Sequence, residues 1–507
     1  MESALTTAFQ MIFAPKLLLF IFAGVIFGIT VGAIPGLTAT MAIAILVSFT
    51  FGMSTMEAFM ILIGVYVAGV YGGSIAAILL HIPGTPSAIM TAQDGYPMSK
   101  KGLAGQAIGI ATTASFLGGM ISIVFLVLGA PIIARFALKF SAPEYFALAI
   151  FGLTIIANVS GKSLLKGLIA GAIGILLSTV GMDPVTGIKR FTFGQMNLVN
   201  GINFIPLMIG LFGISEILEQ LRYIGLRERV KQEINNVIPS LGVFKRIFKF
   251  IVRSSLIGTF IGALPGAGGS IASFVAYNDA KQIAKNPEEF GTGAPEGIAA
   301  SEAANNATIG GALMPLLTLG VPGDAITAIL IGAFMIHGLQ PGPVLFKNNP
   351  EIIYAIYLAA VLANIFMLVA GMAGAKLFAK FINIPLNILL PVIVFLCTVG
   401  SYAATNNYFD MGVMITFGVV GYSLIKLGVP MAPMVLGVVL GPIAETNLRT
   451  ALVMYDNNFL VLFTRPIAAF FWLIIIGTIL YPYVKKHGIK KMRRWFPKKE
   501  NTEKEVY

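Results

Sequence analysis

Long apolar runs, separated by short stretches rich in polar residues, glycine and proline, dominate the sequence. Runs of about 18 or more apolar residues are typical of helices that cross a membrane, whereas shorter runs cannot span about 30 Å as straight helices. The pattern therefore predicts an all-α polytopic membrane protein with about ten to twelve full spans and some broken or re-entrant helices. The runs fall at 17–34, 37–52, 57–80, 103–129, 143–160, 163–181, 203–219, 246–264, 303–320, 324–338, 352–381, 386–402, 411–426, 431–444 and 459–483.

The two halves of the chain carry related motifs in the same order, which indicates an internal duplication. An odd number of crossings between the copies would invert the second one. Inverted repeats are typical of secondary transporters, whose solute site lies between the repeats near the middle of the bilayer. The related pairs are Gly28–Gly36 with Gly258–Gly266, Gly72-Gly73 with Gly310-Gly311, and Ile82–Gly84 with Val321–Gly323, at offsets of 230, 238 and 239 residues.

Composition supports a membrane protein, because only 11% of the 507 residues are charged and 57% are hydrophobic, whereas a soluble domain carries roughly 25% charged residues. The net charge of +12 indicates cytoplasmic basic loops rather than nucleic-acid binding. The positive-inside rule places the basic stretch 222–253 and the tail after 485 in the cytoplasm, and the N-terminus outside. We expect four units: a first membrane repeat at 1–225, a basic cytoplasmic linker at 226–245, a second membrane repeat at 246–484 and a basic cytoplasmic tail at 485–507.

Glycines recur every four residues before two Pro-Gly pairs, as in Gly24, Gly28 and Gly32, and this spacing predicts close helix packing. Each Pro-Gly pair breaks a helix, and a break at membrane depth must line a cavity or be buried in protein. The exposed N–H groups of the following helix could hold an anion without a buried arginine. The candidate solute-binding residues are Pro35, Gly36, Leu37 and Thr38; Pro83, Gly84, Thr85 and Pro86; Pro265, Gly266, Ala267, Gly268, Gly269 and Ser270; and Pro322, Gly323 and Asp324.

Polar residues at membrane depth are the second group of candidates. Glu302, Asn305 and Asn306 share one helix face, and their carboxylate and amide oxygens suit Na⁺, whereas a carboxylate alone suits a proton. The alternative is that Glu302 lies at the membrane interface and the two asparagines only join helices. Asp324 fits the N-cap of its half-helix. The segment Asp94–Pro97 is typical of a turn that closes a loop or acts as a gate.

Sequence motifs of enzymes are not found. The chain has neither a His-Glu-x-x-His zinc motif nor a Gly-x-Ser-x-Gly nucleophile elbow, and its single cysteine, Cys397, forms no internal disulfide or cysteine metal site. We therefore expect a carrier that needs no cofactor beyond a coupling ion. A membrane-embedded enzyme acting on an acidic or lipid-linked substrate remains the alternative, and a passive channel is a third.

The same motifs resemble those of the large membrane subunit, TctA, of tripartite tricarboxylate transporters. The resemblance covers roughly residues 15–480 and is specific because the motifs are long, ordered and duplicated. The residues that carry it are Gly28–Gly36, Tyr71–Ser74, Ile82–Pro86, Asp94–Pro97, Ala294–Gly297, Asn305-Asn306 and Val321–Gly323.

The resemblance implies uptake of carboxylates such as citrate with cations across the inner membrane of bacteria or archaea. It also implies a small four-span membrane subunit and a periplasmic solute-binding protein as partners, and it places the solute between the four Pro-Gly motifs. The sequence leaves open whether the chain forms a homodimer. The chain departs from the family pattern at Asp324, where a small residue such as serine is expected. An acid there opposes a carboxylate unless it is protonated, paired or turned away.

Overall fold

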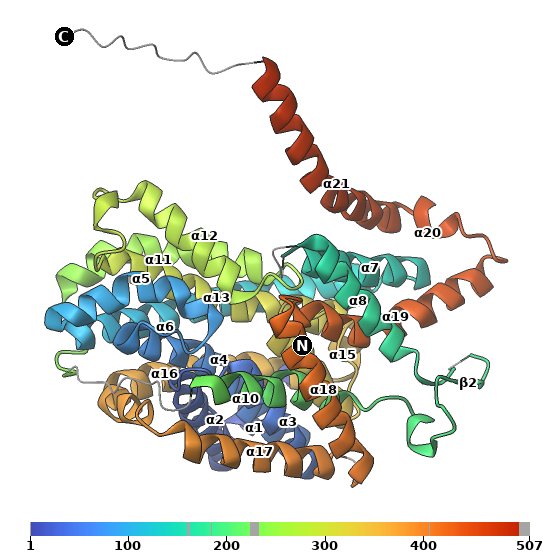
Figure 1. Cartoon of the computed structure of the whole chain (residues 1–507), viewed down its shortest axis with the longest axis horizontal. Helices are drawn as coiled ribbons and strands as arrows, with labels where there is room; N and C mark the ends of the chain where they lie inside the picture. Colours follow the sequence, from blue (N-terminus) through green and yellow to red (C-terminus); the bar gives the residue numbers. More distant parts are fainter. Residues whose placement is uncertain (1, 160–162, 184, 224–232, 405, 496–507) are drawn as a thin grey trace.

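The computed structural model describes residues 2–159, 163–183, 185–223, 233–404 and 406–495. Helices dominate this part of the chain, as the apolar pattern predicts, and one short hairpin of β1 (Gly181–Met182) and β2 (Lys189–Arg190) lies between α8 and α9 (Figure 1). The helices of the first half are α1 (Glu2–Ile12), α2 (Pro15–Ala33), α3 (Ala39–Phe49), α4 (Thr55–Leu80), α5 (Ile89–Met98), α6 (Ala104–Ala137), α7 (Ala142–Val159), α8 (Leu164–Ser178), α9 (Phe204–Met208) and α10 (Ser215–Gln220).

The second half repeats the order of long and short helices. Its helices are α11 (Leu241–Gly262), α12 (Gly268–Ile283), α13 (Pro295–Leu319), α14 (Ala325–Ile336), α15 (Pro343–Asn348), α16 (Pro350–Phe381), α17 (Leu386–Ala403), α18 (Tyr408–Lys426), α19 (Met431–Met454), α20 (Val461–Thr464) and α21 (Pro466–Trp495). Every apolar run of the sequence coincides with a helix. The pattern missed α1, α5, α12 and α15; in α12, polar residues such as Asn278, Asp279 and Lys281 interrupt the apolar face.

Seven helices among the described residues are long and apolar enough to cross a membrane. They span 15–33, 55–80, 86–137, 350–381, 386–403, 408–426 and 431–454, where the third joins α5 and α6. Shorter apolar helices, including α3, α8 and α14, account for several of the short runs. The expected ten to twelve full spans therefore remain a prediction, because several apolar helices are too short to cross alone.

The glycine stripes pack helices against each other, as predicted. A Cβ atom at Gly24, Gly28 or Gly32 would lie 2.3 to 2.8 Å from a backbone oxygen of α4, so only glycine permits this approach. Gly258 and Gly262 of α11 approach α13 in the same way. We call these two glycine-lined interfaces, α2 with α4 and α11 with α13, the packing seams of the two repeats.

The contacts along each seam show that the first helix pair of each repeat runs parallel. Gly24 lies beside Ile61, Gly28 beside Val65 and Gly32 beside Gly69, so α2 and α4 advance in the same direction. An ion pair between Lys16 and Glu57 joins the starts of both helices. Because α4 begins where α2 begins, the intervening α3 must return the chain to that side. The segment 15–49 is therefore a re-entrant hairpin.

The second repeat has the same hairpin, formed by α11 and α12. Arg253 of α11 binds Asp279 of α12 at 2.5 Å, which places the end of α12 near the middle of α11. Arg246, near the start of α11, pairs with Glu296 at the start of α13. The hairpin thus enters and leaves on one side, as in the first repeat.

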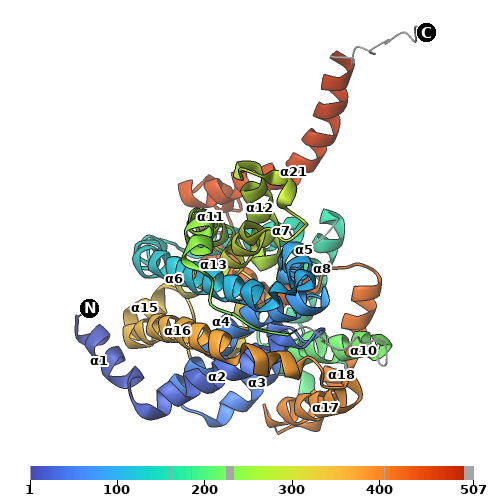
Figure 2. The same cartoon turned by 90° about the vertical axis from the view of Figure 1, so that its left-hand side faces the viewer.

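The central helices of the two repeats run in opposite directions and cross. Asn305 of α13 donates to the Val70 carbonyl of α4 at 3.5 Å, and Asn306 donates to the Val67 carbonyl at 3.3 Å. Residue numbers rise along α13 as they fall along α4, as inverted repeats require. In Figure 2, α2 lies on one side, followed by α4 with α16, then α6 with α13, and α11 with α12 on the other side.

Helices of each half also pack against helices of the other half. The pair α7 and α8 of the first half packs on α19, while α17 and α18 pack on the segment 204–220. The repeat boundaries at 225, 245 and 484 remain predictions, and linker residues 226–232 and tail residues 496–507 lie outside the described part of the chain.

A charged cluster anchors the β-hairpin to α19. Arg190 pairs with Asp183 at 3.2 Å and Glu445 at 2.5 Å, and Arg449 pairs with the same two acids at 2.9 and 2.7 Å. The N–H groups of Thr186 and Val185, together with Arg449, lower the pKa of Asp183 to about 2. The cluster fixes a loop outside the membrane-spanning helices by charge rather than by apolar packing.

Candidate functional site

The four Pro-Gly motifs lie where helices end, as the sequence predicts. In the second repeat, Gly266 has a φ of 77° and donates its N–H to the Gly323 carbonyl at 2.6 Å. Gly323 packs against the end of α11, since a Cβ there would lie 2.6 Å from the Gly262 oxygen. The motifs Pro265–Ser270 and Pro322–Asp324 are therefore in direct contact.

The second motif of the first repeat has the matching position. A Cβ at Gly84 would lie 2.1 Å from the Gly32 oxygen, and the Gly84 N–H donates to the Gly73 carbonyl at 3.2 Å. Thr85 follows, and its hydroxyl bonds to that of Ser87 at 3.0 Å. Thr85 is buried, whereas Pro86 is exposed at the start of a short 3-10 turn.

The tip of α12 brings these motifs together. A Cβ on Gly268 would contact Asp324 at 3.8 Å, and one on Gly269 would lie 2.5 Å from Asn305 Oδ1 and 3.1 Å from Ser87. The N-cap of α12 is Ala267, which has no side-chain acceptor, so the first N–H groups of this helix have no side-chain cap. Ser270 is exposed on the first turn.

The first motif, Pro35–Thr38, is closed differently. Gly36 has a φ of 84°, and a Cβ there would lie 2.0 Å from the side chain of Gln220 on α10. Thr38 caps α3 by accepting the Met41 N–H at 3.1 Å, while Pro35 and Leu37 are buried. The end of α2 just before this motif approaches the second motif, since a Cβ at Gly84 would lie against the Gly32 oxygen.

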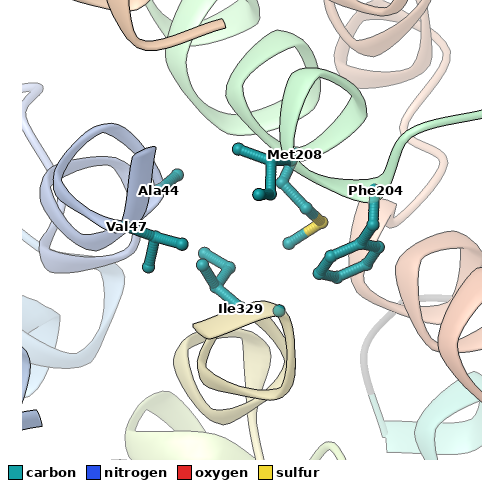
Figure 3. A pocket seen from close by; sticks show the side chains of 7 residues that line it. Ala44, Val47, Phe204, Met208 and Ile329 are labelled. Atoms are coloured by element: carbon teal, nitrogen blue, oxygen red, sulfur yellow. The ribbon is translucent and has the colours of Figure 1, made fainter. Parts of the chain in front are cut away.

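Beyond Thr38, α3 packs on α14, the helix that follows Asp324. Their meeting point with α9 is an apolar pocket lined by Ala44, Val47, Phe204, Met208 and Ile329, and Figure 3 shows these side chains converging. The pocket has no room for a water molecule. It is a packing contact between the repeats and offers no polar group to a solute.

Asp324 is the N-cap of α14, as predicted. Its Oδ1 accepts the Thr327 N–H at 2.7 Å, and its Oδ2 accepts the Tyr66 hydroxyl of α4 at 2.6 Å. Asp324 is only partly buried. Its carboxylate thus combines a capping role with a contact to the other repeat.

Glu302 is fully buried inside the protein, and its position at membrane depth rather than at the membrane interface stays a prediction. Its Oε1 accepts the Thr91 hydroxyl of α5 at 2.5 Å, and its Oε2 accepts the Ser115 hydroxyl of α6 at 3.0 Å. Thr91 also bonds to Ser301 at 3.0 Å. A buried acid that accepts hydrogen bonds from hydroxyl groups of two neighbouring helices can exchange a proton or contribute to a cation site.

Asn305 and Asn306 are also fully buried, and both join α13 to α4 through their amide nitrogens. Their Oδ1 atoms have no hydrogen-bond partner in the described part of the protein. A buried amide oxygen without a donor is costly unless a ligand or water completes it. The two residues therefore serve helix packing and still leave acceptor oxygens for a cation or a solute.

The prediction that Asp94–Pro97 forms a turn is wrong, because these residues lie inside α5. Asp94 is fully buried, and its Oδ1 accepts the N–H groups of Gly291, Gly293 and Ala294 at 2.8 to 2.9 Å. Its Oδ2 accepts the Tyr277 hydroxyl at 2.8 Å. Asp94 therefore fixes the loop that leads into α13 of the other repeat, next to the helix end where the dipole favours a negative charge.

Sequence reasoning missed Tyr66, Ser87, Thr91 and Ser115, which lie in or beside apolar runs. A hydroxyl group on a membrane helix commonly bonds to its own backbone, so the sequence alone cannot mark these four. No group of three or more His, Cys, Asp or Glu side chains that could hold a metal ion occurs within the described ranges. None of the side chains that the contacts bring to the α12 tip is basic, so an anion there would depend on N–H and hydroxyl donors.

Comparison with known proteins agrees with this architecture. Residues 18–436 match the tripartite tricarboxylate transporter TctA family. An uncharacterized 52.8 kDa protein in the TAR-I ttuC' 3' region of Agrobacterium vitis is 40% identical over 467 residues, covering 92% of this chain and 93% of that protein. An uncharacterized protein in the TAR-II ttuC' 3' region of the same organism is 40% identical over 212 residues, covering 42% of this chain and 88% of that protein.

No solved structure matches the chain. The family match covers most of the sequence and includes all four Pro-Gly motifs and α13. Inverted repeats, re-entrant hairpins and buried polar groups on a membrane helix are features typical of secondary transporters. The chain therefore belongs to the TctA family, the membrane component of tripartite tricarboxylate transporters.

Proposed function

We propose that this chain is the permease of a binding-protein-dependent secondary transporter and takes up an organic di- or tricarboxylate, such as citrate, driven by an ion gradient. The observation that carries the proposal is the meeting of three Pro-Gly motifs at the uncapped N-terminus of α12. N–H groups and hydroxyls gathered at a helix N-terminus favour a carboxylate without a buried cation.

The solute site would include all four motifs named in the sequence, with Thr38, Thr85, Ser270 and the adjacent N–H groups as donors. Gly269 supports this assignment, because a Cβ there would meet Asn305 and Ser87, and the Ser87 hydroxyl bonds to that of Thr85. Leu37 is buried and contributes packing. Alternating access would then come from movement of the re-entrant hairpins relative to their packing partners.

The coupling cation, Na⁺ or H⁺, would act at Glu302, Asn305 and Asn306. Two buried amide oxygens without partners and one buried carboxylate provide acceptor atoms within two turns of α13. Hydroxyl oxygens of Thr91, Ser115 and Ser301 lie beside the carboxylate and suit Na⁺ as additional ligands. A cation there would offset part of the charge of the solute.

The partners would be a small four-span membrane subunit and a periplasmic solute-binding protein, and the complex would lie in a bacterial or archaeal inner membrane. The basic segments at 226–245 and 485–507 support a cytoplasmic C-terminus, and the N-terminus would lie outside. The chain itself would have no catalytic role and no cofactor besides the coupling ion.

The test is uptake of labelled citrate, malate and succinate into vesicles that hold the chain and its small subunit, with the binding protein outside. Imposed Na⁺ and proton gradients are compared with no gradient. Saturable accumulation that depends on one gradient would support the proposal and identify the ion. Release of a chemically altered solute would instead support the enzyme alternative, and non-saturating flux without counterflow would support a channel.

A further inference from the structure

The internal repeat relates two groups of residues at the N-terminus of α12, which we call half-sites: Asp324 with Tyr66, and Thr85 and Ser87 with Asn305. The offset of 239 residues that aligns Pro83-Gly84 with Pro322-Gly323 also aligns Thr85 with Asp324 and Tyr66 with Asn305. In each half-site, the residue after Pro-Gly comes from one repeat and the aligned residue of the central helix comes from the other. Asp324 bonds directly to Tyr66, while Ser87, whose hydroxyl bonds to that of Thr85, lies with Asn305 against Gly269.

The two half-sites are adjacent. Asp324 contacts the position of Gly268 and Asn305 contacts that of Gly269, so consecutive residues of α12 separate them. Asn305 is fully buried, and its Oδ1 atom lies against Gly269 without a hydrogen-bond partner. Ser87, Gly268, Gly269 and Asp324 are all partly exposed. One small solute can therefore touch both half-sites.

The chemistry of the half-sites differs although their backbone positions correspond. The half-site of Thr85 offers hydroxyl donors and the N–H groups of α12, which suit a carboxylate. The half-site of Asp324 offers a carboxylate instead. Donors from Thr327 and Tyr66 hold that carboxylate at 2.7 and 2.6 Å, and hydrogen bonds of this kind stabilise its charged form. It repels a second carboxylate and attracts a hydrogen-bond donor.

We propose that Asp324 determines specificity by accepting a hydrogen bond from a hydroxyl group of the solute, so that the site selects hydroxylated carboxylates over their non-hydroxylated counterparts. The proposal rests on the proposed carboxylate transport and specifies the solute further. A hydroxyl group next to a carboxylate gives the solute one end for each half-site. A solute without that hydroxyl leaves Asp324 facing apolar carbon, and the desolvation of the carboxylate is then not compensated.

Two matched pairs of solutes test the proposal, because each pair differs by one hydroxyl group: malate with succinate, and citrate with tricarballylate. We would measure half-saturating concentrations for uptake with the same binding protein throughout, so that differences between variants report on this chain alone. The wild type is expected to prefer the hydroxylated member by at least about tenfold, the usual effect of a hydrogen bond to a charged group.

Asp324→Thr makes the two half-sites alike and retains an N-cap residue for α14. We expect the ratio for each pair to fall to within about twofold of one, while uptake of the non-hydroxylated member is retained or improved. Tyr66→Phe is the matched control, because it removes the phenol and leaves the carboxylate, so the preference for the hydroxyl group should remain. Thermal melting of each variant in detergent establishes that the protein is folded.

An unchanged ratio in Asp324→Thr, or a wild-type ratio near one, would overturn the proposal while leaving carboxylate transport intact. If the wild type accumulates none of the four carboxylates with its complex intact, the proposed function fails first. The two failures are therefore distinguishable.

Discussion

The two repeats share their packing seams and differ at their tips. Both seams are lined by glycines that admit no side chain, at Gly28 and Gly32 in one repeat and at Gly258 and Gly262 in the other. At the tips, which are the Pro-Gly motifs that follow α2 and α11, Gln220 covers Gly36, whereas Gly266 bonds directly to Gly323. Close packing permits only glycine along a seam, but several kinds of side chain can fit at the tips. Duplication thus preserved the frame and allowed the chemistry of the two half-sites to diverge.

The largest effect is expected from a bulky residue at the tips themselves. Gly36→Leu and Gly266→Leu both place a side chain at a φ near 80°, which costs roughly 1–2 kcal/mol in strain, and at Gly36 the new side chain also displaces Gln220. We expect each variant to lower uptake by at least about a hundredfold while the protein stays in the membrane.

Gly52→Leu is the control for this pair, because no atom lies within 4 Å of a Cβ at that position and its φ is ordinary. Uptake rates are normalised to the amount of protein in the membrane. Wild-type uptake by Gly266→Leu would remove the tip of α12 from the solute site. If Gly266→Leu loses uptake and Gly36→Leu does not, only the Pro-Gly motif of the second repeat contacts the solute.

Glu302→Gln tests whether α13 couples transport to a cation. The amide keeps the size of the side chain but cannot release a proton, and it removes a negative charge that would attract Na⁺. We expect the stimulation of uptake by the driving gradient to fall by about tenfold or more. Exchange of labelled for unlabelled solute at equal concentrations should fall less, because it needs no net movement of the cation. Glu288→Gln, at an exposed acid, is the matched control. An unchanged ion dependence would return Glu302 to a structural role.

Asp94→Asn probes the contact between the repeats rather than the solute site. The substitution weakens three bonds from N–H groups of the loop before α13 and the bond from Tyr277. We expect a loss of about 1–3 kcal/mol in stability, measured as a lower melting temperature in detergent. Tyr277→Phe should lose about 1 kcal/mol, since it removes one bond. A melting temperature equal to wild type in both variants would contradict a stabilising role of Asp94 at this loop.

The smallest effect is expected at the β1–β2 hairpin, whose charged cluster lies apart from the proposed solute site. Asp183 has a pKa of about 2 in the folded protein against an ordinary value of 3.8. Its stabilising contribution is therefore complete above about pH 4 and is lost as the pH falls through 2. Limited acid proteolysis between β1 and β2 should increase over that window in the wild type. In Asp183→Asn, cleavage should be independent of pH there; a persistent pH dependence would assign the effect to Glu445.

Much of the fold follows from the sequence, because apolar runs of membrane length and glycines at four-residue spacing each have one dominant structural meaning. The offsets between Gly28 and Gly258 and between Gly84 and Gly323 also predicted the inverted duplication. The helix α12 escaped prediction because its polar face is matched by partners such as Arg253, which only the folded chain brings near.

For the candidate site, the sequence predicted the backbone features, which are the helix breaks and an N-cap, but not the side-chain contacts. Pro-Gly pairs reveal where helices break, and Asp324 fits an N-cap from local sequence alone. Tyr66, Thr91 and Ser115 could not be assigned, since their partners lie at least 187 residues away in the chain. The interpretation of Asp94 failed for a related reason. Asp-Gly-Tyr-Pro favours a turn locally, but in the fold these residues lie in α5 and the Asp94 carboxylate binds N–H groups of the loop before α13, about 200 residues away in the chain.

The exchange of helices between the repeats has a consequence for biosynthesis. When the ribosome has completed the first half, α7 and α8 lack their partner α19, and the hydroxyls of Thr91 and Ser115 lack Glu302. A nascent first repeat in the membrane is therefore incomplete on surfaces that the second repeat must later fill. Its maturation depends on the last third of the chain, so truncation after α18 should leave a product that membrane quality-control proteases remove, even though most of the motifs are already present.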